Sequence, residues 1–295
     1  MSEINEEIGS LEYIHSKIQE VFVPVPFIGG RFIINKGLSP NFQVNHTLSF
    51  GNGDQSGYKF GATYVGHNKI NENEPNPILM GEIQPNGSLQ AQIIHSINRN
   101  IKFKYLAQIQ NNIMIGQKYA FETKNDIWQA CLTLINPDIT KMECMSVIDI
   151  MKKVTNSVQL GSMLVCNYSP NLPSCKEAHW SIGGKYITEN WQTSLSFRPL
   201  QTSFHASFWM RVKSDLHFAG ELESNYPQQT NVASIGYQYE IPKSGLIWKS
   251  QFDSNCNIIS SFEKRLFPFP LSFTICTIGA LFKGKCDFGV GLTLG

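Results

Sequence analysis

Apolar and polar side chains take turns along most of this chain, starting about thirty residues from its N-terminus. In residues 41–50, for example, one phase holds Phe42, Val44, Leu48 and Phe50, and the other holds Asn, Gln, Thr and Ser. A period of two is typical of a β-strand with one apolar and one polar face. Because Gly, Asn, Pro and Ser separate such segments, the pattern predicts an all-β fold of many consecutive strands.

The alternation predicts about nineteen strands, most of about 7 to 12 residues, which suits strands tilted about 45° across a bilayer about 30 Å thick. No apolar run reaches the roughly 18 residues that a spanning helix needs, so any membrane crossing must use strands. The strands are predicted at 31–36, 41–50, 58–65, 78–84, 88–95, 101–110, 115–123, 126–134, somewhere in 141–155, and at 158–168, 178–187, 191–198, 202–211, 215–223, 232–240, 245–253, 257–264, 271–282 and 284–294.

Nearly all charged residues of the predicted strands lie on the polar phase, while several aromatic residues lie on the apolar phase. A Lys or Arg on a lipid-facing position costs about 2 to 4 kcal/mol at the bilayer midplane, so this phasing favours a membrane barrel with a wet interior. In a soluble β-sandwich the same charges would face solvent, and that alternative stays open on the pattern alone. The charges concerned are Lys59, Glu82, Lys102, Lys104, Lys118, Glu122, Lys185, Arg211, Glu221, Glu223, Lys249, Asp253, Glu263 and Asp287.

The C-terminal segment has the cleanest alternation. Its apolar phase is Phe288, Val290, Leu292 and Leu294, and its other phase is small or polar. A soluble chain seldom ends on such a strand, because an edge strand with an apolar face invites aggregation. In a closed barrel the first strand pairs with it and lipid covers it, so we expect the two ends of the chain to meet.

Residues 1–30 form a separate N-terminal segment, before a barrel predicted at 31–295. The spacing of Leu11, Ile14, Ile18 and Val21 predicts an amphipathic helix at about 10–22, which Ser10 caps. Pro24 and Pro26 end it. An isolated helix of about 13 residues is marginal in water, so its apolar stripe needs a surface to rest on.

Composition narrows the function classes. A net charge of +1 with scattered basic residues argues against a nucleic-acid binder. Seven cysteines without a Cys-x-x-Cys pair favour free thiols. The acidic N-terminus resembles neither a signal peptide nor a transit peptide, so we expect any organelle address to be internal. A mean hydropathy of −0.17 is compatible with a barrel, because its two faces average out.

The sequence predicts no enzyme, metal site or cofactor. Its seven histidines lack His-x-x-x-His spacing, and no phosphate loop or nucleophile elbow is present. Glu221 and Glu223 lie two apart on one predicted strand and point the same way. They are interpreted as part of a polar lumen in preference to an acid/base pair.

Several segments together resemble the channel subunit of the translocase of the mitochondrial outer membrane, the TOM complex, within the mitochondrial porins. They are collinear with that family from about residue 20 onward: 35–47 (NKGLSPNFQVNHT), 60–66 (FGATYVG), 87–95 (GSLQAQIIH), 136–138 (NPD), 190–191 (NW), 234–238 (SIGYQ), 253–255 (DSN), 262–264 (FEK) and 288–295 (FGVGLTLG). The resemblance implies a transmembrane β-barrel of nineteen strands, with the first and last parallel and an N-terminal α-helix in the lumen. Residues 138–155 depart from the family's plainly alternating strand, and the N-terminal extension is short.

The last strand also resembles the sorting signal of mitochondrial outer-membrane barrels, through Asp287, Gly289, Leu292 and Leu294. The resemblance implies a location in that membrane and a pore for unfolded, presequence-bearing precursors. It further implies contacts with membrane lipid, single-helix receptor and small accessory subunits, and a second barrel.

Presequences are basic and amphipathic, so we expect an acidic lumen to attract them weakly and apolar lumen positions to receive their apolar face. The expected acids are Glu82, Glu122, Glu221, Glu223, Asp253, Glu263 and Asp287, and the expected apolar residues are Ile94, Leu106, Ile127 and Ile247. The alternatives are a metabolite or anion porin like the voltage-dependent anion channel, and a soluble β-rich binding protein.

Overall fold

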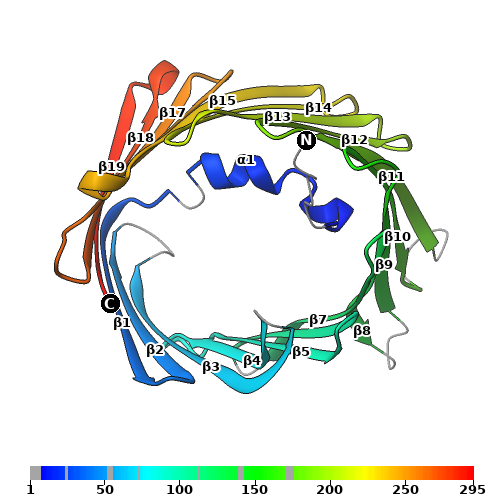
Figure 1. The fold of residues 1–295 in the computed structure, drawn as a ribbon, viewed down its shortest axis with the longest axis horizontal. Coiled ribbons are helices and arrows are strands. Elements are labelled where there is room, and N and C mark those ends of the chain that lie inside the picture. The colour runs from blue at the N-terminus through cyan, green and yellow to red at the C-terminus, as the bar shows by residue number, and fades with distance from the viewer. Residues whose placement is uncertain are drawn as a thin grey trace.

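The alternating segments form 19 strands that join edge to edge in a single sheet, which closes on itself in the computed structural model (Figure 1). The structure describes residues 8–23, 26–51, 56–71, 74–111, 113–138, 143–170 and 176–295. The strands are β1 (Gly29–Ser39), β2 (Phe42–Phe50), β3 (Gly57–Asn71), β4 (Glu74–Ile83), β5 (Leu89–Asn98), β6 (Ile101–Gln110), β7 (Ile113–Lys124), β8 (Trp128–Asp138), β9 (Glu143–Lys153), β10 (Val158–Tyr168), β11 (Lys176–Ile187), β12 (Trp191–Arg198), β13 (Ser203–Lys213), β14 (Leu216–Asn225), β15 (Thr230–Ile241), β16 (Leu246–Asp253), β17 (Asn257–Arg265), β18 (Leu271–Ala280) and β19 (Lys285–Leu294).

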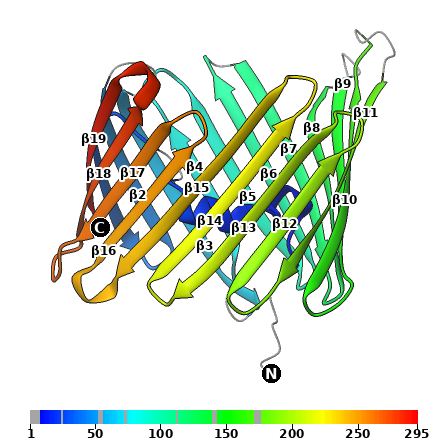
Figure 2. The same cartoon turned by 90° about the horizontal axis from the view of Figure 1, so that it is seen from above.

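The first and last strands close the barrel and run parallel, from Gly29 beside Gly289 to Ile34 beside Leu294. The remaining neighbours are antiparallel, and the strands are tilted (Figure 2). Closure leaves the sheet without an unpaired edge. The last strand, β19, pairs with β1 on one side and with β18 on the other, so the two ends of the barrel meet as predicted. Among the described residues no helix is long and apolar enough to cross a membrane.

The register separates an inner from an outer face, because paired residues of neighbouring strands point to the same side of a sheet. The Asp149 side chain reaches the N-terminal segment inside the ring, which orients β9 and, through the pairing, each strand in turn. The charged strand residues predicted for the lumen then all lie on the inner face. On the outer phase, Lys36, Lys152 and Lys264 lie within the last four residues of their strands.

The outer face is apolar and exposed, as a lipid-facing wall must be. Ile235, for instance, is 65% exposed. His46 interrupts this face in the middle of β2, and its ring Nδ1 lies 2.7 Å from the hydroxyl of Tyr58 on β3. The aromatic residues predicted on the apolar phase also point outward: Trp128, Trp191, Phe208, Tyr237 and Trp248.

The strand expected within 141–155 is β9, and it pairs with β8 and β10 along nearly its whole length. Its alternation is hard to read because both faces are apolar: Ile148 and Ile150 point to lipid, while Val147 and Met151 point inward. Met151 is 1% exposed because the N-terminal segment packs on it.

The N-terminal helix lies inside the barrel as predicted, but one continuous helix over 10–22 is wrong. A 3-10 turn at Leu11–Tyr13 is followed by α1 (Ser16–Val21), a helix of only six residues. The two are separated at His15, whose φ of −97° and ψ of 9° are not helical. Because the His15 ring contacts the barrel wall, the segment forms two short helical pieces instead of one long helix. Ser10 caps the first piece as predicted, its Oγ accepting from Glu12 N at 3.2 Å.

Candidate functional site: the barrel lumen

One end of the N-terminal segment is fastened to the inner wall by Asp149 of β9. The Asp149 carboxylate accepts hydrogen bonds from Ser10 Oγ and, at 2.7 Å, from the backbone N–H of Leu11. Asp149 is only 4% exposed, and apolar residues of the segment pack around it against Met151. A buried carboxylate that accepts backbone N–H groups is a strong local anchor. The segment is therefore held against the inner wall of the barrel.

A second anchor lies at the break between the two helical pieces. The His15 ring lies 2.6 Å from Ser207 Oγ through Nδ1 and 3.1 Å from Ser196 Oγ through Nε2, and it stacks on His205 with centroids 3.6 Å apart. Burial, and then the neighbouring His205, lower the pKa of His15 from 6.5 to about 3. His15 is therefore neutral in the docked segment at physiological pH.

Glycines of the inner wall let two side chains and one backbone oxygen of the segment approach the sheet backbone. A Cβ on Gly183 would lie 2.8 Å from Leu11 Cδ1, and one on Gly236 would lie 2.7 Å from the Phe22 ring. A Cβ on Gly289 would lie 2.2 Å from the backbone oxygen of Phe27, where the chain passes from the lumen into β1. Because contacts under 3.0 Å force a shift, these glycines set the path of the segment along the wall.

The α1 half rests on β13–β15 (Figure 1). Ile18, Val21 and Phe22 bury their side chains against Ala219 and Trp209. The Lys17 ammonium lies 5.5 Å from the Trp209 ring, and the Lys249 ammonium donates to the backbone oxygen of Glu20. The predicted apolar stripe therefore has the surface that it needs.

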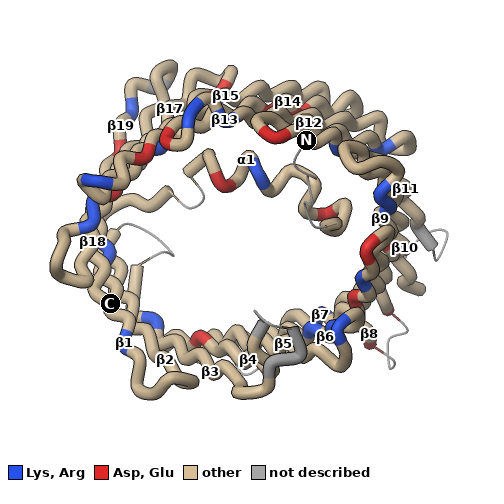
Figure 3. Tube along the Cα trace, viewed as in Figure 1, with Lys and Arg blue, Asp and Glu red and all other residues tan. Residues whose placement is uncertain are grey.

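The register places all the predicted lumen acids on the inner face, but they differ in what surrounds them. Figure 3 marks the positions of charged residues around the ring. On β4 and β7 each acid is paired with a lysine: Glu82 lies 3.2 Å from Lys59, and Glu122 lies 2.6 Å from Lys104. Attraction for a passing basic peptide is therefore partly cancelled on this side of the pore.

Acids on β14–β19 keep more of their negative field. Asp253 accepts from Ser234 Oγ at 2.7 Å and from the Gln251 amide at 3.2 Å, which stabilises the carboxylate without cancelling its charge. Glu263 lies 3.8 Å from Arg265, while no ion pair of Asp253 or Asp287 is found among the described residues. The lumen is thus more negative along β14–β19 than along β3–β7.

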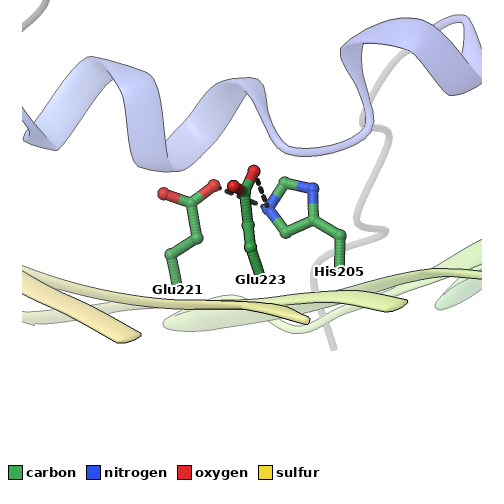
Figure 4. A group of neighbouring side chains, drawn as sticks. All are labelled: His205, Glu221 and Glu223. Carbon is green, nitrogen blue, oxygen red and sulfur yellow. Dashed lines mark hydrogen bonds and ion pairs between the residues drawn. The ribbon is translucent and has the colours of Figure 1, made fainter. Parts of the chain in front are cut away.

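Two further lumen acids, Glu221 and Glu223 of β14, meet His205 of β13 directly under the N-terminal segment (Figure 4). His205 Nε2 lies 2.6 Å from Glu221 Oε1 and 3.8 Å from Glu223 Oε1. Sequence reasoning identified the two glutamates but not the histidine, because the three residues share no motif and meet only through the pairing of β13 with β14.

The predicted apolar lumen positions have different outcomes. Ile94, Leu106 and Ile247 point inward from β5, β6 and β16. Ile127 does not lie on a strand: it directly precedes β8, is 57% exposed, and its backbone oxygen accepts from Lys153 N, so its place in the lumen stays a prediction. β8 begins two residues later than predicted, at Trp128, after the polar residues Asn125 and Asp126.

Sequence reasoning missed a second inner apolar strip, on β8–β10. It is formed by Ile135, Met145, Val147, Met163 and Val165. The signal was present as the inner phase of β9, but the apolar outer phase of the same strand concealed it.

The residues of the predicted sorting signal occupy both faces of β19. Asp287 and Gly289 point inward, while Leu292 and Leu294 point outward. Gly289 accommodates the Phe27 backbone, so this glycine has a structural role in the finished barrel. Recognition of the strand by sorting machinery stays a prediction.

Comparison with known protein families shows to which family this barrel belongs. The eukaryotic porin family matches residues 7–288, which includes the lumen segment and nearly all of the barrel. The chain belongs to the eukaryotic porin family. Its porin fold is the closed barrel described above, with parallel first and last strands.

Several relatives of this porin have TOM40 names. The chain is 33% identical to the "Mitochondrial import receptor subunit TOM40 homolog 2" of Drosophila melanogaster over 97% of this chain and 84% of the relative. It is 34% identical to the TOM40 homolog of Xenopus laevis, with the same coverage. It is 32% identical to the Homo sapiens TOM40 homolog over 97% of this chain and 78% of that protein.

Proposed function

We propose that this porin is the protein-conducting channel through which unfolded, presequence-bearing precursors cross the mitochondrial outer membrane. The observation that carries the proposal is the inner wall: carboxylates along β14–β19, the apolar residues Ile94 and Leu106 on β5 and β6, and the apolar strip on β8–β10 line one aqueous lumen. A basic amphipathic presequence offers the complementary charge and apolar face. The names of the relatives as import receptor subunits support the same function.

Many weak sites suit transport better than one strong site, because a passing chain must be able to leave as well as enter. The carboxylates are spread over several strands, and the most exposed ones are solvated, so each contributes little binding energy. A precursor can therefore exchange one contact for the next. We assign no enzymatic reaction to Glu221 and Glu223.

The proposed assembly is the one that the resemblance to the channel subunit of the TOM complex implies. We propose that membrane lipid, single-helix receptors and small accessory subunits cover the apolar outer face, and that two barrels pair side by side in a TOM complex. An outer face made of exposed apolar side chains supports such packing.

Depletion of the chain tests the function directly. Mitochondria from depleted cells should lose uptake of a radiolabelled presequence-bearing precursor, and re-expression of this chain should restore it. Unchanged uptake after depletion, with an intact inner-membrane potential, would rule the proposal out.

A metabolite porin remains the second candidate, because the lumen also carries inward lysines on β6 and β7 (Lys102, Lys104 and Lys118). Such a porin would prefer small anions. The two candidates differ in ion preference and in their response to a basic peptide.

A further inference from the structure

We propose that His205, Glu221 and Glu223 form a binding site for a transition-metal ion, best suited to Zn²⁺, on the lumen wall beneath the N-terminal segment. The ligand atoms of these side chains all lie within 4.8 Å of one another. One imidazole nitrogen and two carboxylate oxygens are ligands that Zn²⁺ accepts, and three protein ligands leave a coordination position for water.

Two of the three ligand pairs already lie near the spacing that a metal ion needs. Ligand atoms about 2.0–2.2 Å from a tetrahedral ion lie roughly 3.4 Å from one another. His205 Nε2 is 3.8 Å from Glu223 Oε1 and 2.6 Å from Glu221 Oε1. The second pair is hydrogen-bonded, so a bound ion would take the place of its shared proton and the two groups would separate by less than about 1 Å.

His15 holds the imidazole ring of His205 in a fixed orientation. Its ring stacks on His205 with an interplanar angle of 26°, and it is itself held by Ser207 and Ser196. Both nitrogens of His15 have partners, so it orients the His205 ring without competing for the ion. Orientation of a ligating histidine by its neighbours is a usual part of metal sites.

Ions can reach the site from the pore. Glu223 is 63% exposed, and a cavity of about 220 Å³ beside it is lined by His205, Glu223 and Ser196. Arg198 lines the same cavity and weakens cation binding electrostatically, but two carboxylates outnumber it. Figure 4 shows all three side chains projecting from the sheet toward the segment above.

Zinc binding by the purified full-length chain in detergent tests the site. Equilibrium dialysis against ZnCl₂, followed by elemental analysis, should give one ion that is lost in Glu223→Gln. Removing one ligand should weaken binding by more than the roughly 10–100-fold that loss of an outer-shell partner costs. Glu82→Gln, which removes a lumen carboxylate elsewhere, is the matched control and should keep the ion.

His205→Gln provides the second variant, and Co²⁺ distinguishes this site from the free cysteines of the barrel. Visible d–d bands of tetrahedral Co²⁺ without thiolate charge-transfer absorption are expected in the wild type and absent in His205→Gln. The same zinc content in Glu223→Gln and Glu82→Gln, or thiolate bands alone, would overturn the proposal. Import activity plays no part in these readouts, so they stand apart from the test of the channel.

Discussion

Asp149→Ala should release the N-terminal segment from the barrel wall. Two hydrogen bonds end on the same carboxylate oxygen, from Ser10 Oγ and Leu11 N, and hydrogen bonds to charged groups contribute about 1.5–3 kcal/mol each. The other oxygen, Oδ1, is buried and has no hydrogen-bond partner among the described residues, so removing the carboxylate also relieves a desolvation cost. We therefore expect docking to weaken by about 2–4 kcal/mol in net terms.

At 1.4 kcal/mol for each factor of ten, this loss raises the ratio of undocked to docked segment by about 30- to 700-fold. Hydrogen–deuterium exchange of the purified protein measures the ratio through a peptide covering residues 8–23. That peptide should exchange much faster in Asp149→Ala, while peptides from the strands keep their protection because the backbone pairing of β9 is unchanged. Glu82→Gln is the control. Equal exchange of residues 8–23 in wild type and Asp149→Ala would refute the anchoring role of this carboxylate.

Three further predictions concern the segment, the closure and the lumen. The pKa of His15 is about 3 in the docked segment and 6.5 when the ring is free. The segment should therefore keep its full docking free energy above pH 6.5 and lose about 1.4 kcal/mol of it per pH unit below pH 6.5. Equal exchange protection of residues 8–23 at pH 5 and pH 7.5, after correction for intrinsic rates, would contradict this. Gly289→Ala places a Cβ 2.2 Å from a backbone oxygen, so a lower yield of protease-resistant barrel is expected than for Gly81→Ala, where nothing lies within 4 Å. Asp253→Asn with Asp287→Asn should reduce cation preference, measured as reversal potential, more than Glu82→Gln with Glu122→Gln does, and an equal shift would argue against the uneven charge of the lumen.

Much of the barrel could be predicted because lipid and water impose opposite demands on successive residues. A period of two over nearly the whole chain specified the strands, the inner phase of the charges and the pairing of β19 with β1. The pattern was harder to read where a strand faces neither lipid nor water but the N-terminal segment inside the lumen. Met151 on the inner face of β9 packs against the apolar N-terminal segment, so in the sequence it resembles a lipid-facing residue.

The lumen contacts depend on register, which the sequence leaves open. His205 faces Glu223 because β13 and β14 pair with a bulge between Arg211 and Lys213. A shift by one residue would turn one partner to the lipid, so the meeting of the three side chains cannot be read from spacing. The break at His15 likewise arises from contacts with β12 and β13, which no helix propensity encodes.

Single-channel recording in a planar bilayer tests most directly whether this lumen conducts basic polypeptides. The reconstituted barrel should carry a current that favours cations, and a basic amphipathic presequence peptide should interrupt it briefly and in a voltage-dependent way. A strong preference for anions, with no interruption by the peptide, would contradict the account.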